Sequence, residues 1–167
     1  LNCAWNGHHF FFLDTPGYPD FCGDAIGALS IADFVLLVVD ANLGIGPGTL
    51  RAWKIARDAG IPRAFFINGC DREQADYQGV LAAVQESFGA TVCVPYTVPV
   101  GEKEGLSGVV SVLDPKAADV DEYREAVMDA VAGSDDALME KYLDQGQLSP
   151  EELSRGLHQA LFSGAIV

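Results

Sequence analysis

The hydrophobic pattern of the first half of the chain alternates between short apolar runs and apolar residues at helical spacing. Three aromatic or apolar runs have the length of buried strands: His8–Leu13, Phe34–Val39 and Ala64–Ile67. Apolar residues recur every three or four positions in three further segments, which predicts helices: Phe21–Ala32, Leu50–Gly60 and Asp76–Phe88. Strands and helices that alternate through short links are typical of a parallel sheet wound with helices, here with strands covered on both faces.

The pattern changes after Ala90. Thr91–Val100 and Gly108–Leu113 are predicted to be short strands. Three helical segments follow them: Glu122–Ala132, Asp135–Leu143 and Ser149–Phe162. Capping residues mark two helix starts, Thr49 before the second helix of the chain and Ser149 in a Ser-Pro-Glu-Glu sequence.

Composition and charge narrow the possible function classes. The chain has 167 residues, 49% of them hydrophobic, which suffices for a core of about one domain. With 24 acidic and 10 basic residues it carries a net charge of −14, which argues against wrapping nucleic acid with this surface. Four cysteines without a C-x-x-C pair favour reduced thiols in the cytoplasm. No apolar run approaches the roughly 18–20 residues of a membrane span, so we expect no membrane partner.

Polar residues follow the predicted strands at their carboxyl ends, where the ligands of parallel sheets bind. Asp14 follows the first strand in the turn sequence Asp-Thr-Pro-Gly, Asp40 follows the second, and Asn68–Asp71 follows the third. A carboxylate before a glycine turn presents charge and backbone N–H groups to a phosphate. Two local alternatives stand beside a ligand site: a helix cap at Asp14 and an Asx turn at Asn68 and Asp71.

Taken together, these motifs resemble the GTP-binding domain of translational GTPases of the elongation factor G type. Asp14–Gly17, followed by an Asp-Phe pair, is similar to the switch-II motif of that family. Asn68–Arg72 stands where the family has Asn-Lys-x-Asp-Arg, and Val38–Asn68 is similar to the segment between the two motifs.

The resemblance extends over nearly the whole chain and implies its domain organisation. Val98–Asp114 and Asp135–Asp144 are similar to a small inserted subdomain that distinguishes this type of factor. The implied fold class is α/β, with an incomplete P-loop GTPase-like parallel sheet and flanking helices in residues 1–90. Residues 91–167 are implied to form a small α+β inserted subdomain. Because the chain opens without Met directly before a strand, we expect an internal fragment of a longer protein.

The resemblance also implies cofactors, GTP or GDP with Mg²⁺ in the complete protein, and residue roles. Asp14 is implied to act at Mg²⁺, Gly17 at the γ-phosphate and Tyr18 near the attacking water. Asn68 and Asp71 are implied to bind guanine. A carboxylate accepts hydrogen bonds from the N–H groups that distinguish guanine. Adenine is rejected because its binding would leave the carboxylate without hydrogen-bond donors.

Three departures from the family pattern bear on activity. Tyr18 replaces a histidine, and a phenol with an ordinary pKa of about 10 is a poor general base at neutral pH. Gly69 replaces the lysine whose stem covers the guanine ring. The sequence G-x-x-x-x-G-K-[ST], which cradles phosphates, does not occur in these residues. We therefore expect the isolated chain to be inactive and to bind no cofactor.

Partners and alternative functions follow from the same comparison. The complete protein is expected to act in translation on the ribosome in the cytoplasm, with the ribosomal stalk protein as a further partner. A non-hydrolysing nucleotide-sensing or ribosome-binding module is the alternative favoured by Tyr18 and Gly69. A flavodoxin-like signalling domain is a third alternative, against which the inserted subdomain argues.

In the resembled family, one more strand lies between those predicted at His8–Leu13 and Phe34–Val39. Without it, both strands would leave backbone groups unpaired at a large free-energy cost. We therefore expect these two strands to pair with each other or with another copy of the chain. The exposed sheet edges predict self-association.

Overall fold

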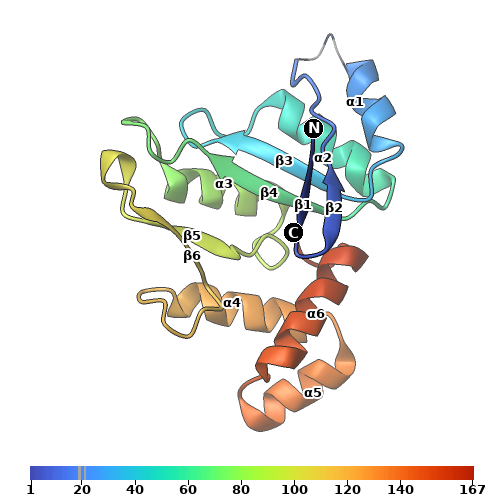
Figure 1. Cartoon of the computed structure of the whole chain (residues 1–167). Helices are drawn as coiled ribbons and strands as arrows, with labels where there is room; N and C mark the ends of the chain where they lie inside the picture. The colour runs from blue at the N-terminus through green and yellow to red at the C-terminus, as the bar shows by residue number, and fades with distance from the viewer. Residues whose placement is uncertain (19, 21) are drawn as a thin grey trace.

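Strands and helices alternate along the first half of the chain, as the apolar pattern predicts (Figure 1). The computed structural model describes residues 1–18, 20 and 22–167. Its first half contains β1 (Asn2–Trp5), β2 (His8–Phe11), α1 (Cys22–Leu29), β3 (Val35–Asp40), α2 (Pro47–Asp58), β4 (Arg63–Asn68) and α3 (Tyr77–Phe88). Its second half contains β5 (Thr97–Val100), the short 3₁₀ helix η2 (Lys103–Gly105), β6 (Gly108–Ser111), α4 (Asp121–Ala132), α5 (Asp136–Gln145) and α6 (Pro150–Ser163). Phe21, the predicted first residue of a helix, lies outside the described residues.

The centre of the first half is the parallel pair of β3 and β4. Their register places Val35 opposite Arg63 and Asp40 opposite Asn68, so both strands end at the same edge. One face of the pair packs on α2 and α3 in a common hydrophobic cluster. The buried members of this cluster are Val35, Leu37, Val39, Trp53, Ala56, Val80, Val84 and Cys93.

The prediction that Phe34–Val39 is covered on both faces is wrong. Side chains of a strand point alternately to its two faces, and α2 and α3 cover only one of them. Leu36 and Val38, which point the other way, are 51% and 59% exposed, whereas Val39 is 1% exposed. The continuous apolar run therefore predicted the strand correctly, but it did not predict that one face of the strand is exposed.

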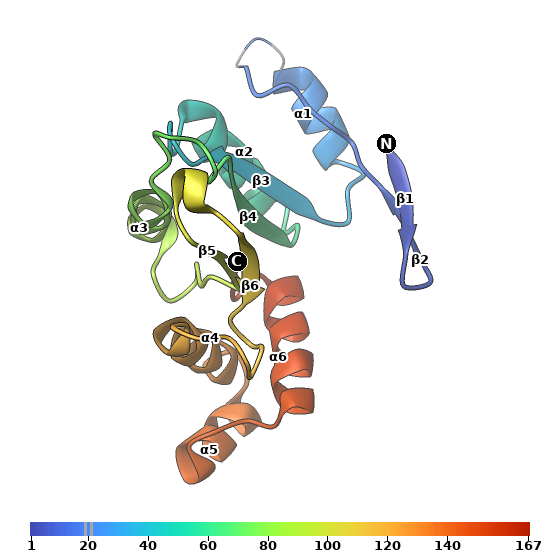
Figure 2. The same ribbon diagram turned by 60° about the vertical axis from the view of Figure 1, so that its left-hand side comes forward.

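The prediction of a buried parallel strand at His8–Leu13 is also wrong. β2 ends at Phe11 and pairs antiparallel with β1, and all residues of both strands are exposed. The hairpin turns at Asn6 and Gly7, whose positive φ values of 49° and 78° match the tight turn that an Asn-Gly pair favours. Figure 2 shows this hairpin beside the β3–β4 pair and not within it.

The expected pairing of the predicted first and second strands with each other is not formed. β2 hydrogen-bonds to β1, and β3 hydrogen-bonds to β4. Local closure through the two-residue turn explains this choice, because adjacent strands pair at a smaller entropic cost than distant ones. Pairing with another copy, and hence self-association through these edges, stays a prediction.

An aromatic cluster holds the two helices on the sheet. The ring of Trp53 from α2 stacks on Phe65 of β4 at a centroid distance of 5.3 Å and lies 4.4 Å from Phe88 of α3. The guanidinium of Arg63 lies 4.2 Å from the Trp53 ring centre and donates to the carbonyl of Ile61. Burial lowers the pKa of Arg63, which is the one buried charged residue of the described chain.

The second half forms a separate hydrophobic cluster between the β5–β6 hairpin and α4–α6. Val112, Val127, Val131, Ala132 and Ala160 are fully buried there. β5 begins at Thr97, six residues later than predicted at Thr91, and pairs antiparallel with β6. The division of the chain at residue 90 stays a prediction. Within the described ranges, no helix is long and apolar enough to cross a membrane.

Capping residues explain where several helices begin. Ser149 forms the predicted capping box with Glu152 at the start of α6. Thr49 is not the cap of α2, because that helix starts earlier, at Pro47 with Gly46 as its N-cap. The hydroxyl of Thr49 instead accepts from the backbone N–H of Gly46 at 3.4 Å.

A glycine allows α6 to approach its neighbours closely, which yields a first prediction. A Cβ at Gly156 would lie 2.6 Å from Cγ1 of Val131 and 2.7 Å from Cδ1 of Leu138. We expect Gly156→Ala to lower the free energy of unfolding by about 1–2 kcal/mol, because overpacking outweighs the gain in helix propensity. Gly27→Ala is the control. It lies in α1 with nothing within 4 Å, so we expect a gain of about 0.5–1 kcal/mol. Urea denaturation measures both changes, and a stabilised Gly156→Ala variant would contradict the packing.

A second prediction concerns the ion pair between Lys141 of α5 and Glu152 of α6. The Lys141 ammonium, followed by the N–H and hydroxyl groups of Ser149, lowers the pKa of Glu152 from 4.5 to about 2. A lowered pKa in the folded state stabilises the fold above pH 4.5, and this stabilisation is lost as the pH falls towards 2. We expect Glu152→Gln to lower the melting temperature at pH 7 and to have a much smaller effect near pH 2, where about half of the Glu152 carboxyl groups are protonated. Glu151→Gln, which changes an exposed carboxylate on the same helical turn, is expected to leave the pH dependence unchanged.

Candidate functional site

The segment after β4 carries two of the predicted site residues. Asn68 is the last residue of β4, and its carbonyl accepts from the backbone N–H of Ala41 at 2.8 Å. Asp71 follows three residues later, and both residues are exposed. Within the described part of the chain, neither side chain forms a hydrogen bond, so the amide and the carboxylate are both available to a ligand.

Asp40 connects this segment to the preceding strand. Its Oδ1 accepts from the backbone N–H groups of Asn42 at 2.9 Å and Leu43 at 3.3 Å, which forms an Asx turn at Asp40. The Asx turn that the sequence allowed at Asn68 and Asp71 is not seen among the described residues. Its Oδ2 lies 2.6 Å from Nη1 of Arg72. The N–H of Asn42 first, and then that of Leu43 and the charge of Arg72, lower the pKa of Asp40 against the opposing effect of burial. The carboxylate is therefore ionised and bound on both oxygens at neutral pH.

The predicted switch-II residues lie in the exposed loop between β2 and α1. Asp14, Gly17 and Tyr18 are all exposed, and the Tyr18 side chain is 76% exposed. Asp14 lies well before Cys22, where α1 begins, so it is not a cap of that helix. The carbonyl oxygen of Gly17 lies 2.8 Å from the position of a Cβ at Gly48, so the loop comes close to the start of α2.

Both predicted motifs border the segment that leaves β3. Asn68 contacts its beginning at Ala41, and Gly17 contacts its end at Gly48. This is the carboxyl end of the β3–β4 pair, where ligands of parallel sheets bind. The structure thus brings Gly17 and Asn68 to one segment. It places the Tyr18 side chain in solvent, without a partner among the described residues.

A polar cavity of about 580 Å³ lies beside the Asn68–Asp71 segment. The start of α3 and the tip of the β5–β6 hairpin enclose it. Its lining includes Cys70, Gln74, Tyr77, Gln78 and Lys103. Burial first, and then the charge of Asp71, raise the pKa of the Cys70 thiol, which is therefore a neutral group at pH 7.

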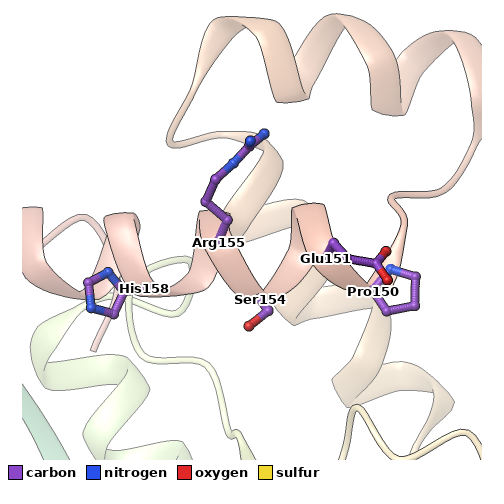
Figure 3. Close-up of a pocket in the computed structure, with 5 residues that line it drawn as sticks. All are labelled: Pro150, Glu151, Ser154, Arg155 and His158. Atoms are coloured by element: carbon purple, nitrogen blue, oxygen red, sulfur yellow. The ribbon is translucent and has the colours of Figure 1, made fainter.

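A second hollow, of about 570 Å³, lies on α6 and is a poor candidate for a site. Pro150, Glu151, Ser154, Arg155 and His158 line it, and all five belong to one helix. Figure 3 shows that Arg155 points away from Ser154 and His158, so the polar groups do not converge. The hollow is open to solvent along its length and contributes nothing to the site at the sheet edge.

Among the residues that the structure describes, a metal ion would have to bind through isolated carboxylates. Among the residues that the structure describes, no three His, Cys, Asp or Glu side chains gather in a group that could hold a metal ion. Mg²⁺ needs no such group, because it keeps several waters and binds through one or two carboxylates together with substrate phosphates. The exposed carboxylate of Asp14, beside the Gly17 turn, fits that requirement.

Sequence reasoning missed the part that Arg72 takes at this site. Asp40 and Arg72 are 32 residues apart in the chain, and only the register of β3 with β4 brings them together. The available signal was opposite charge at the ends of two successive predicted strands. That pattern of charges gives no information on which strands lie next to one another in the sheet.

Comparisons with known proteins agree on one family. The sequence matches the family described as elongation factor Tu GTP binding domain over residues 1–161. It is 30% identical to an elongation factor G-like protein of Thermotoga maritima, over 98% of this chain and 26% of that protein. A crystal structure of a Thermus thermophilus protein matches with a TM-score of 0.87 at 30% identity, over 99% of this chain and 27% of the other. The chain thus spans about a quarter of the length of these relatives. The matches confirm the family resemblance and the α/β fold class.

The left-handed glycine after Asn68 yields a third prediction. Gly69 has a φ of +78°, and a Cβ there would lie 3.1 Å from Nε of Arg72. Gly60 is the matched control, with a φ of +67° and nothing within 4 Å. We expect Gly60→Ala to cost about 1–2 kcal/mol from backbone strain alone, and Gly69→Ala to cost more. Urea denaturation measures both, and in an Arg72→Ala background the excess cost of Gly69→Ala should disappear. Equal costs in the native background would show that Arg72 does not cover Gly69.

Proposed function

The chain belongs to the elongation factor Tu GTP-binding domain family, and we propose on that premise that it forms part of a GTP-binding domain of the elongation factor G type. The observation that carries the proposal is the position of Asn68 and Asp71. Asn68 ends a parallel strand and Asp71 follows three residues later, and their side chains bind nothing else among the described residues. The domain would bind GTP and GDP with Mg²⁺ as part of a translation factor.

We assign base recognition to the segment after β4. The Asp71 carboxylate is an acceptor, suited to the two N–H groups on one edge of guanine, and the Asn68 amide supplies both a donor and an acceptor. Adenine presents a donor and an acceptor in different positions, so its binding would leave the carboxylate without its partners. This difference supports selectivity for guanine.

We assign the phosphate end to the loop between β2 and α1. The carboxylate of Asp14 would hold Mg²⁺, and the backbone N–H of Gly17 would meet the terminal phosphate. Bound Mg²⁺ supplies charge neutralisation for phosphoryl transfer. The close approach of Gly17 to Gly48 supports this assignment, because it brings the loop towards the edge of the sheet where Asn68 lies.

Hydrolysis would depend on a partner that orders Tyr18. Its hydroxyl can position a water molecule, but a phenol is a poor base at neutral pH. Its side chain is 76% exposed, so nothing in the described chain fixes its orientation. We propose that the ribosome supplies this order for the complete protein, in the cytoplasm. The name of the Thermotoga maritima relative supports the link to translation.

We further propose that residues 91–167 are the inserted subdomain of this factor type. The separate hydrophobic cluster of the β5–β6 hairpin and α4–α6 supports that division. The acidic surface of this unit would meet the ribosomal stalk protein. Excess acidic residues in the first turns of α4, α5 and α6 make that surface negative at the helix starts.

A non-hydrolysing nucleotide sensor is the second candidate function. Two departures favour it: the exposed Tyr18 in place of a histidine, and Gly69 in place of the lysine that covers guanine. Measurement of GTP turnover with and without ribosomes separates the two. Ribosome-stimulated turnover would establish the enzyme, and nucleotide binding without turnover would establish the sensor.

Guanine recognition yields a fourth prediction, tested on the full-length gene product by calorimetry with Mg²⁺ present. We expect GDP to bind and ADP not to bind. Asp71→Ala should weaken GDP binding about 10- to 150-fold, because hydrogen bonds to a charged group contribute about 1.5–3 kcal/mol. Glu73→Ala removes a neighbouring exposed carboxylate and should leave the affinity unchanged. Equal affinity for GDP and ADP would exclude the proposed recognition.

A further inference from the structure

Arg72 occupies the space that a side chain at position 69 would fill. Its Nε, Cζ and Cδ atoms lie 3.1, 3.2 and 3.5 Å from the position of a Cβ at Gly69. Any residue larger than glycine would therefore require the guanidinium to move. The planar group of Arg72, and not the side chain of residue 69, closes the segment after β4.

Asp40 holds the guanidinium in this place. Nη1 of Arg72 lies 2.6 Å from Oδ2 of Asp40, and the other carboxylate oxygen is bound by the N–H groups of Asn42 and Leu43. A carboxylate fixed by two backbone groups cannot follow a moving arginine, so it acts as an anchor. The planar guanidinium suits such a fixed partner better than the flexible ammonium of lysine.

The Arg72–Asp40 ion pair links the turn that carries Asn68 and Asp71, the proposed base-binding residues, back to β3. Asp40 is opposite Asn68 in the register of β3 and β4, and the N–H of Ala41 donates to the carbonyl of Asn68. From Asn68 the chain turns through Gly69, where the N–H of Arg72 donates to the Gly69 carbonyl at 3.2 Å. Asn68 and Asp71 thus belong to the one turn that the Arg72–Asp40 contact ties back to β3.

We propose, on the premise of the guanine recognition above, that Arg72 is a positioning residue for Asn68 and Asp71, with Asp40 as its anchor. The two side chains of the pair are 58% and 31% exposed, and exposed ion pairs contribute little to global stability. The function of the pair is therefore local: it limits the conformations of the turn, so that the amide and the carboxylate are ordered before the base arrives.

GDP and ADP titrations of the full-length gene product with Mg²⁺ test this role. We expect Arg72→Ala and Asp40→Asn each to weaken GDP binding about tenfold, and the double variant to lose no more than either alone. Arg72→Lys, which keeps a charge for Asp40, should lose less. This partial rescue by the conservative variant distinguishes positioning from a purely structural defect, and none of the variants is expected to gain ADP binding. Arg57→Ala, which breaks the exposed pair with Asp58 at 3.0 Å, is the matched control and should change nothing.

Amide hydrogen exchange in the nucleotide-free protein separates this role from the proposed function. We expect Arg72→Ala to lower the protection of the Ala41 and residue-72 amides while the urea midpoint stays unchanged. If the native protein binds no GDP, the proposed function fails, whatever the exchange shows. If it binds GDP and Arg72→Ala changes neither affinity nor exchange, guanine recognition stands and the positioning role of Arg72 is overturned.

Discussion

The parallel pairing of β3 with β4 is the constraint on which the rest of the site depends. It places Asp40 and Asn68 opposite one another at a common edge. From that edge one segment runs to α2 and the other to α3, so the contacts among Asp40, Asn68 and Arg72 are made by residues at the ends of these two strands or directly after them. A shift of one residue in this register would turn the apolar side chains of β3 away from α2 and α3, and the hydrophobic cluster therefore fixes the geometry of the site.

The helices stabilise that register from one side only. Trp53, Phe65 and Phe88 join α2, β4 and α3 into one aromatic cluster at the face opposite Leu36 and Val38. The cluster lies on the sheet face and includes neither Asp40 nor Asn68, the residues that end the two strands. The residues that stabilise the sheet and the residues proposed to bind a ligand therefore lie on different parts of the same two strands, as is common in parallel sheets.

The sequence predicted the parts of the fold that depend on neighbouring residues. The helix start at Ser149 follows from its capping box and is observed, whereas Thr49, the other predicted cap, is not the cap of α2. The β1–β2 hairpin was missed although Asn6 and Gly7 form a strong turn signal, because the apolar run after it suggested a buried strand. A run of apolar residues defines a strand but not what covers each of its faces. The candidate site was also predicted only in part. Asn68 and Asp71 are recognisable from their spacing at the end of a predicted strand. The contact of Arg72 with Asp40 was not predictable, because it depends on which strands are neighbours and in which register they pair.

The close cover of Gly69 by Arg72 also restricts how this segment changes during sequence divergence. A Cβ at position 69 would lie 3.1 Å from Nε of Arg72, so a side chain there requires the guanidinium to shift, and residue 69 has a left-handed backbone that favours glycine. A side chain gained at position 69 would therefore shift the guanidinium and alter its contact with Asp40 across the strands. Substitutions at positions 40, 69 and 72 are therefore expected to be coupled in their effects, because a change at one alters the contacts of the others.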